Sequence, residues 1–278
     1  MKKYLILILL FLLIFSLGYS EEKIVSLSPA LTDIVIDLGK QDSLKGVTDY
    51  CKVPDNLKEE VIRIGSAINP SYEKIVRIKP DLVLLYIENR KIIEFLEKKN
   101  YNYMAFKHRK IDHIYNTVSE ISKKLGVYKK GRNLIDNSKN KLQKLRNKSR
   151  KLNKRTVLVI IGRQINNLEN IYIAGNDEFI SQILEVINLK NAYSGSIDYP
   201  KVSIEGIIKM NPDIIIEVLP NLVNKYGEKE IKKDWKDIKY LNAVKYDSVF
   251  VMGEDFRLIP SLEIIEAAEK FYSKIYGN

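Results

Sequence analysis

The stretch Ser71–Leu85, SYEKIVRIKPDLVLL, decides the fold, because Ser203–Glu217, SIEGIIKMNPDIIIE, repeats its pattern 132 positions later. Ser, Glu, Ile, a basic residue, Pro and Asp recur in the same order without a gap. In each copy a Ser N-cap and a first-turn Glu begin a short helix, which ends before Pro. Pro-Asp then leads into an apolar run that is typical of a strand buried on both faces. Two copies of one helix-turn-strand unit predict two similar lobes.

The first twenty residues have the pattern of a secretory signal peptide. Lys2 and Lys3 precede an apolar run from residue 4 to residue 17, and Gly18 and Ser20 are the small residues expected before a cut after Ser20. The run is shorter than the ~18 residues that favour a membrane-spanning helix. An uncleaved N-terminal anchor is the alternative. We expect an exported, periplasmic protein.

Charge and cysteine content restrict the class of protein further. The formal net charge is +11, and loss of Lys2 and Lys3 would leave +9, but the Lys residues are mixed with Asp and Glu and no nucleic-acid motif accompanies them. We therefore expect a solvated surface and no nucleic-acid partner. The single cysteine, Cys51, cannot form an internal disulfide, so we expect it to be either buried or a free thiol. It does not lie at the cleavage site, so we expect a protein that is not lipid-anchored. We also expect a monomer.

Strands alternate with helices along the rest of the chain, which predicts an α/β protein with mainly parallel sheets. Residues 128–154 read as one long, basic helix with few apolar positions, which is more typical of a bridging element than of a core helix. A basic helix that binds lipid or nucleic acid is the alternative. The predicted divisions are a signal peptide (1–20), an N-terminal lobe (21–126), a connecting helix (127–154) and a C-terminal lobe (155–278).

Three parts of the sequence resemble the class III periplasmic solute-binding proteins of ABC importers. They are residues 24–32 (IVSLSPALT), both copies of the repeat, and residues 264–268 (IIEAA). This family carries cobalamin, ferric siderophores or haem. The resemblance implies two α/β lobes joined by one long rigid helix, with the ligand held between them. It also implies an ABC permease and ATPase as partners, a small metal-chelate ligand, and no cofactor of the protein's own.

Within the family the likeness is greatest to the cobalamin-binding member, whose ligand site is lined by aromatic side chains from both lobes. Rigid aromatic faces suit a flat, amphipathic macrocycle. Loops of this chain that match the family's carry five aromatic residues, and these are the predicted ligand-binding residues: Tyr50, Tyr86, Tyr172, Tyr199 and Phe256. Any single Tyr could instead be an ordinary core or surface residue in a chain with 17 of them.

Two departures from the cobalamin binder leave the identity of the ligand undecided. Ala67 and Ile68 stand where that protein has a Trp, and the cleft aromatics are Tyr rather than Trp. A phenolate is also a ligand for ferric iron, so a ferric-siderophore or haem carrier is the alternative to a corrinoid carrier. An anionic ferric complex would require Arg residues, and the candidates are Arg63, Arg90, Arg163 and Arg257.

Glu73 and Glu205 occupy the same position in the two copies of the repeat. In the family, one Glu on each lobe docks onto basic pockets of the permease, and the resemblance implies this role for both residues. The alternative is that each carboxylate only stabilises its own helix dipole, which is worth ~0.3–1 kcal/mol.

Two other classes of protein are disfavoured by the residues present. A zinc or manganese carrier needs three or four ligands, typically rich in His, and the chain has only His108 and His113. An enzyme is disfavoured because the sequence has no nucleophile elbow, no Gly-rich phosphate loop and no convincing Cys-His pair. We therefore predict a binding subunit that does no chemistry of its own.

Overall fold

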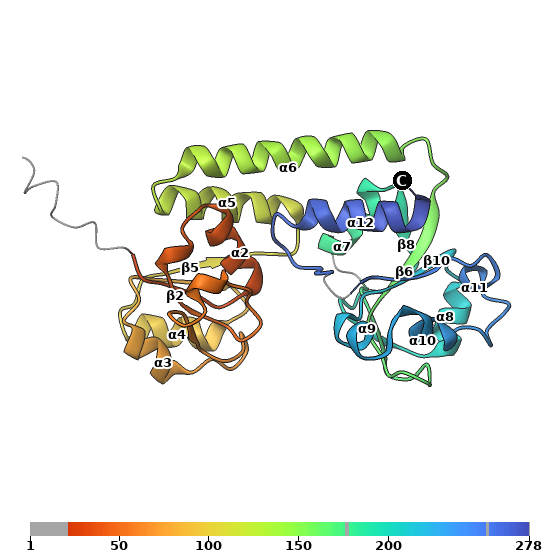
Figure 1. Ribbon diagram of the computed structural model, residues 1–278, viewed down its shortest axis with the longest axis horizontal. Helices are drawn as coiled ribbons and strands as arrows, with labels where there is room; N and C mark the ends of the chain where they lie inside the picture. Colours follow the sequence, from red (N-terminus) through yellow and green to blue (C-terminus); the bar gives the residue numbers. More distant parts are fainter. Residues whose placement is uncertain (1–21, 176–177, 254–255, 278) are drawn as a thin grey trace, which may run out of the picture. The chain divides into compact units, whose positions relative to one another are not determined.

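The computed structural model describes residues 22–175, 178–253 and 256–277, and these form two compact units that meet in sequence between Ala105 and Phe106 (Figure 1). The predicted signal peptide lies outside the described residues. Both units are built of strands and helices, which confirms the predicted α/β class. The boundary differs from the predicted one, because residues 106–126 pack with the second unit. The connecting role of residues 127–154 stays a prediction.

The first unit contains a five-stranded sheet in the order β3-β2-β1-β4-β5, and β1 pairs in parallel with both β2 and β4. Its strands are β1 (Ile24–Ser26), β2 (Leu44–Val47), β3 (Ile62–Arg63), β4 (Leu82–Tyr86) and β5 (Tyr103–Phe106). Its helices are α2 (Pro29–Asp37), α3 (Tyr72–Ile78) and α4 (Arg90–Lys98). Parallel strands place their carboxyl ends at one edge of the sheet, which is where loops of α/β proteins bind ligands.

The second unit contains a mixed sheet in the order β11-β10-β6-β7-β9, with β8 also paired to β6. The pairs of β10 with β6 and β11 and of β6 with β8 are parallel, whereas β7 is antiparallel to both β6 and β9. The strands are β6 (Arg155–Gly162), β7 (Ile171–Ile173), β8 (Leu189–Asn191), β9 (Lys201–Val202), β10 (Ile214–Glu217) and β11 (Val249–Val251).

Eight helices among the described residues accompany this sheet. They are α5 (Ile111–Lys124), α6 (Tyr128–Ser149), α7 (Glu178–Val186), α8 (Ile204–Met210), α9 (Pro220–Tyr226), α10 (Glu228–Lys233), α11 (Asn242–Lys245) and α12 (Ile264–Tyr276). The long basic helix ends at Ser149, five residues earlier than predicted, and a turn then leads into β6. Helix α6 packs on α5, α7 and α12 through a narrow stripe of small and apolar residues.

Both faces of the second sheet are covered, as the apolar strand runs predict. On β6, Val157 and Val159 belong to one buried cluster with α7 and α12, whereas Leu158 and Ile160 belong to another with Trp235. Neighbouring residues of a strand point to opposite faces, so a run of consecutive apolar residues can fill both clusters. The prediction of strands buried on two faces is therefore confirmed.

Both copies of the repeat fold as the same helix-turn-strand unit. The Oγ of Ser71 accepts a hydrogen bond from the Lys74 amide at 3.3 Å, and the Oγ of Ser203 accepts one from the Gly206 amide at 3.2 Å. Helices α3 and α8 each span seven residues and end in a left-handed residue immediately before Pro. The strand that follows each helix then pairs in parallel with the first strand of its own unit.

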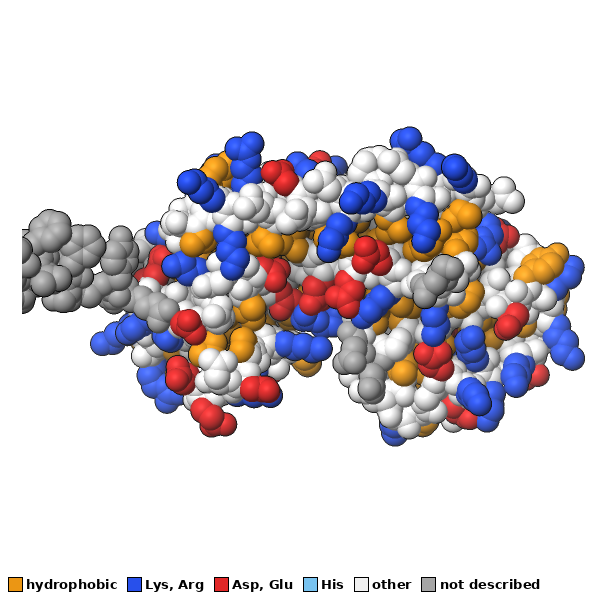
Figure 2. Space-filling view, turned by 45° about the horizontal axis from the view of Figure 1, so that its top comes forward, with side chains coloured by type: hydrophobic (Ala, Val, Ile, Leu, Met, Phe, Trp, Pro, Cys, Tyr) orange, Lys and Arg blue, Asp and Glu red, His pale blue; other side chains and the backbone are white. Residues whose placement is uncertain are grey.

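The surface carries interleaved charges of both signs, as the mixed sequence predicts. Figure 2 shows Lys and Arg side chains spread among Asp and Glu on the face in view. Across residues 22–175, 178–253 and 256–277, no helix has both the length and the apolar character that a membrane crossing requires.

Candidate functional site

Two of the predicted ligand-binding residues lie at the carboxyl edge of the first unit's sheet. Tyr86 is the last residue of β4 and is partly buried, and Tyr50 lies in the loop after β2 with 78% of its side chain exposed. A large aromatic ring with this exposure contributes nothing to the core. It is available to a ligand.

Hydrogen bonds hold the loop that carries Tyr50 in place. Arg63 Nη1 donates to the carbonyl oxygens of Thr48 at 3.0 Å and of Cys51 at 2.6 Å. The Cys51 thiol is buried and lies 3.1 Å from the Thr32 hydroxyl and 3.0 Å from the Thr48 hydroxyl. Arg63 therefore positions Tyr50, and this guanidinium is already engaged by carbonyl groups.

The Tyr86 hydroxyl has a defined protonation state. Burial raises the pKa of Tyr86 well above its ordinary value, and a hydrogen bond with Ser28 only partly opposes this effect. The phenol therefore stays protonated at neutral pH. The hydroxyl itself is buried, so the ring and not the hydroxyl is the part of Tyr86 that a ligand could contact.

In the second unit, Tyr172 and Tyr199 lie beside the carboxyl end of β6. Tyr172 lies on β7 and pairs with Gly162 at the end of β6, and Tyr199 comes just before β9, which pairs with β7. Their side chains are 45% and 50% exposed. Both side chains are therefore about half exposed to solvent.

The loop that carries Tyr199 is pinned by several contacts. The Gly175 amide donates to the Asp198 carbonyl at 2.7 Å, and a Cβ on Gly175 would clash with the Ile197 carbonyl and the Pro200 ring. Arg109 binds the Asp198 carboxylate through two hydrogen bonds of 2.5 and 2.7 Å. These hydrogen bonds from Arg109 hold the pKa of Asp198 below its ordinary value, so the pair is ionised at neutral pH.

A pocket of about 360 Å³ brings Tyr199 and Phe256 together. Phe256 is only 3% exposed and stacks on Phe271 with 5.1 Å between ring centroids, so it forms part of the wall and not a free face. The other lining residues are mostly apolar and include Ile161, Phe179, Ile180, Val218, Pro220 and residues 257–260. This size and lining are typical of small-molecule sites.

His108 also lines this pocket, although the sequence did not identify it as a ligand-binding residue. It follows β5 in a short loop, and it shares this pocket with residues that lie far from it in the chain. Arg257 lines the same pocket and forms an ion pair with Glu263. Of the four candidate Arg residues, Arg257 is the one that this pocket contains. Tyr172 does not line it.

Arg163 is not available to a ligand, because it lies in a buried ion-pair network. Its guanidinium donates to both carboxylate oxygens of Glu217, at 2.9 and 3.1 Å, and to Asp234 at 2.5 Å. Trp235 Nε1 donates to Glu217 Oε1 at 2.5 Å. Burial raises the pKa of Glu217, and the charge and hydrogen bonds of Arg163 oppose that effect. The network ties β6 and β10 to the segment that follows α10.

Glu73 and Glu205 are both exposed in the first turn of their helices. A hydrogen bond from the Ser203 side chain, followed by one from the backbone, lowers the pKa of Glu205, so this carboxylate is ionised at neutral pH. The structure thus leaves both carboxylates open to solvent at equivalent places in the two units.

Comparison with known proteins defines the class. A family model described as periplasmic binding protein matches residues 24–256, and the chain belongs to this family. It is therefore an extracytoplasmic solute-binding protein, the substrate-binding component of an ABC importer, and not an enzyme. The family acts with permease and ATPase components of the importer and binds small molecules.

Three similar proteins illustrate the range within the family. The uncharacterized ABC transporter substrate-binding lipoprotein YvrC of Bacillus subtilis (strain 168) is 28% identical over 92% of this chain and 81% of its own. The vitamin B12-binding protein of Vibrio vulnificus (strain YJ016) is 25% identical over 93% of each chain. The crystal structure of the periplasmic heme binding protein HutB of Vibrio cholerae superimposes with a TM-score of 0.80 over 92% of this chain and 100% of that one, at 18% identity. This last likeness concerns the fold alone.

Proposed function

We propose that the protein captures a corrinoid of the cobalamin type and delivers it to the permease of its importer. The observation that carries the proposal is the second unit's pocket, where Tyr199 and Phe256 meet in a mostly apolar wall at the carboxyl edge of the sheet. Exposed Tyr50 and protonated Tyr86 occupy the corresponding edge of the first unit. The likeness to a vitamin B12-binding protein over nearly the whole chain supports the same ligand.

A haem or ferric-siderophore ligand is the second candidate, and one observation favours it. His108, Tyr199 and Arg257 line the same pocket. An imidazole and a phenol are both ligands for ferric iron, and a guanidinium suits a carboxylate group of an iron complex.

Calorimetric titration of residues 21–278 with cyanocobalamin, haem and ferric citrate separates the two candidates. We expect submicromolar binding of cyanocobalamin and roughly tenfold or greater loss on Tyr199→Ala, since truncation of an aromatic anchor costs ~2 kcal/mol. Tyr240→Ala is the matched control, because Tyr240 is exposed but does not line the pocket. Saturation with haem or ferric citrate and no heat with cyanocobalamin would replace the corrinoid and leave the transport function intact.

We further propose that Glu73 and Glu205 are the permease-docking residues, one in each copy of the repeat. Their exposure and equivalent positions support this role, since a permease with two-fold symmetry could bind both.

We also propose that the exported protein is a monomer, is released by cleavage after Ser20 and carries no lipid. Intact-mass measurement on exported protein tests the cleavage and the absence of lipid, and a mass that keeps residues 1–20 or carries a lipid-sized increment would contradict them. Light scattering tests the monomer, and a mass of twice the chain would contradict it.

A further inference from the structure

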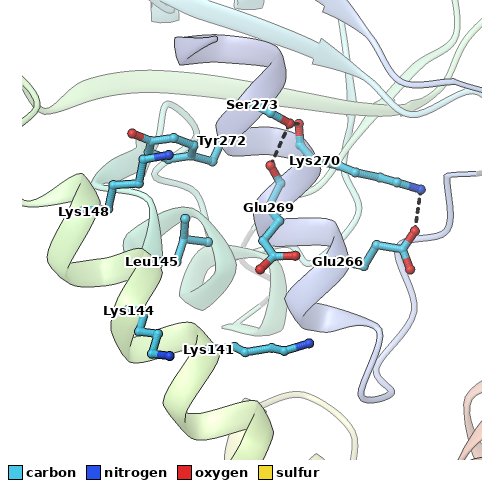
Figure 3. A pocket seen from close by; sticks show the side chains of 9 residues that line it. All are labelled: Lys141, Lys144, Leu145, Lys148, Glu266, Glu269, Lys270, Tyr272 and Ser273. Carbon is cyan, nitrogen blue, oxygen red and sulfur yellow. Dashed lines mark hydrogen bonds and ion pairs between the residues drawn. The ribbon is translucent and has the colours of Figure 1, made fainter. Parts of the chain in front are cut away.

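A groove of about 410 Å³ lies between α6 and α12 (Figure 3), and it shares no lining residue with the pocket that contains Tyr199 and Phe256. Three lysines of α6 line it, Lys141, Lys144 and Lys148, together with Lys270 of α12. Leu145 and the ring of Tyr272 form its apolar part. The groove belongs wholly to the second unit, in which α6 and α12 pack directly against each other.

The positive charges of this groove are only partly neutralised. Lys270 Nζ forms an ion pair with Glu266 at 2.6 Å, and Lys148 Nζ lies 4.4 Å from the centroid of the Tyr272 ring. Within the part of the chain that the structure describes, Lys141 and Lys144 form no ion pair and no side-chain hydrogen bond. Glu269 is the one further carboxylate in the groove. Once the Lys270–Glu266 pair is set aside, three ammonium groups face one carboxylate, and the formal excess is +2.

Helix α6 bears this excess at a cost to its own stability. Lys141, Lys144 and Lys148 are spaced by three and four residues, so they lie on one face of the helix, where like charges repel. The helix contains eight Lys or Arg residues and a single acidic residue, Asp136, which lies near Arg132 and outside the groove. An anion from outside the chain would relieve the repulsion that the helix itself does not offset.

We propose that the groove between α6 and α12 binds a phosphomonoester group. Such a group carries a charge of about −1.5 to −2 at pH 7, which matches the formal excess of the groove. Its oxygens accept charge-assisted hydrogen bonds from ammonium groups, and Lys141 and Lys144 are free to donate them. The apolar surface of Leu145 and Tyr272 would accommodate the carbon skeleton that bears the phosphate. The same chemistry is offered by a soluble phosphomonoester and by the headgroup of phosphatidic acid.

Two probes distinguish these sources. The full exported chain is titrated calorimetrically with glycerol 3-phosphate, and it is sedimented with phosphatidylcholine vesicles that contain or lack phosphatidic acid. The test variant is Lys141→Ala with Lys144→Ala. The matched control is Lys129→Ala with Lys130→Ala, which removes two exposed charges from the same helix outside the groove. Thermal melting verifies that both double variants remain folded.

We expect at least one probe to bind and the groove variant to weaken it by up to roughly fivefold for each lysine, the size expected of a partly solvated charge pair. Binding of both probes would indicate a general phosphomonoester site, and binding of vesicles alone would indicate a lipid headgroup. Failure of both probes to bind, or equal losses in the groove variant and the control, would overturn the proposal. Cobalamin titration of the same variants keeps this test separate from the transport function.

Discussion

The two copies of the repeat share their backbone and differ in what their strands end on. Strand β4 ends on Tyr86, a half-buried tyrosine, whereas β10 ends on Glu217, a fully buried carboxylate held by Arg163 and Trp235. The seven-residue helix, its Ser N-cap and the Pro-Asp turn are common to both. The repeated part therefore builds the sheet of each unit. The residue at the carboxyl end of the strand differs: Tyr86 is a predicted ligand-binding residue, whereas Glu217 belongs to a buried ion-pair network.

The anchoring Asp shows a second, smaller difference. Asp81 accepts one hydrogen bond from the Lys23 amide at 2.8 Å, just before β1. Asp213 accepts two from Thr156 on β6, from the amide and the hydroxyl, both at 2.8 Å. Each Asp thus ties its own strand to the beginning of the strand beside it, but the second copy does so more firmly.

The largest expected effect is on ligand uptake, and it comes from Glu73 and Glu205, which occupy equivalent positions in the two copies. Reversing both exposed carboxylates, Glu73→Lys with Glu205→Lys, should lower uptake of the bound ligand into cells by roughly 100-fold or more. Two attractions at the permease would become repulsions, which cost several kcal/mol. Ligand affinity, measured by calorimetry, should not change. The control is Glu60→Lys with Glu185→Lys, exposed positions away from the helix N-termini. Normal uptake by the Glu73/Glu205 variant would show that these carboxylates serve only their own helices.

The next largest effect is on stability, and it compares the residues at the carboxyl ends of β4 and β10. Arg163→Met should destabilise the second unit by about 3–5 kcal/mol, because it leaves Glu217 buried without its counter-charge. Tyr86→Phe in the first unit should cost only about 1 kcal/mol, the value of one hydrogen bond. Urea unfolding followed by fluorescence reports on the second unit, since Trp235 is the chain's single tryptophan. Adding Glu217→Leu to Arg163→Met should restore part of the loss, and no restoration would contradict this account of the network.

A third effect tests the anchoring Asp. Asp213→Ala should cost about 1–3 kcal/mol at pH 7, because it leaves the Thr156 amide without its acceptor, and Asp81→Ala should cost less. Burial alone would raise the pKa of Asp213, but the hydrogen bonds from Thr156 and Asn242 outweigh it and hold the pKa below its ordinary value. Its contribution is therefore complete above about pH 4 and is lost as the pH falls through the folded-state pKa. The wild type and Asp213→Ala should converge in acid, and a constant difference down to pH 2 would refute this.

The smallest effect concerns the left-handed residue that ends each helix. Lys79 has φ 50° and Asn211 has φ 42°, and Asn tolerates this conformation better than Lys does. Lys79→Asn should therefore stabilise the first unit by about 0.5 kcal/mol in thermal or urea unfolding. Asn211→Lys should cost more than that, since the Asn211 side chain also accepts a hydrogen bond from the Asn242 amide at 2.9 Å. Equal and opposite effects would mean that this bond contributes nothing.

Much of the fold could be predicted from local signals. The Ser caps, the Pro-Asp turns and the apolar strand runs of the repeat place α3, β4, α8 and β10 within a residue or two of their observed bounds. Strands β8 and β9 were not predicted, because they span three and two residues and owe their form to pairing with β6 and β7. Helices α9 to α11 were also missed, since the charged segment around Trp235 has no clear apolar period.

The site was less predictable, because its contacts join residues far apart in the chain. The position of Tyr199 and Phe256 in one pocket agrees with their predicted role, while the ligand-binding role of all five aromatic residues stays a prediction. Nothing local distinguishes Arg163, whose partner Glu217 lies 54 positions away, from Arg257 in the pocket wall. His108 was missed for the same reason. Side chains of these types become informative only when the sheet brings them together.

The buried thiol of Cys51 makes the protein convenient for fluorescence labelling. Because that thiol is enclosed between Thr32 and Thr48, a maleimide dye should react with an introduced surface cysteine and spare the native one. One such cysteine in each unit, at Glu60 and at Tyr240 for example, would accept a donor and an acceptor dye. Energy transfer between them would report the separation of the two units in single molecules, with and without ligand.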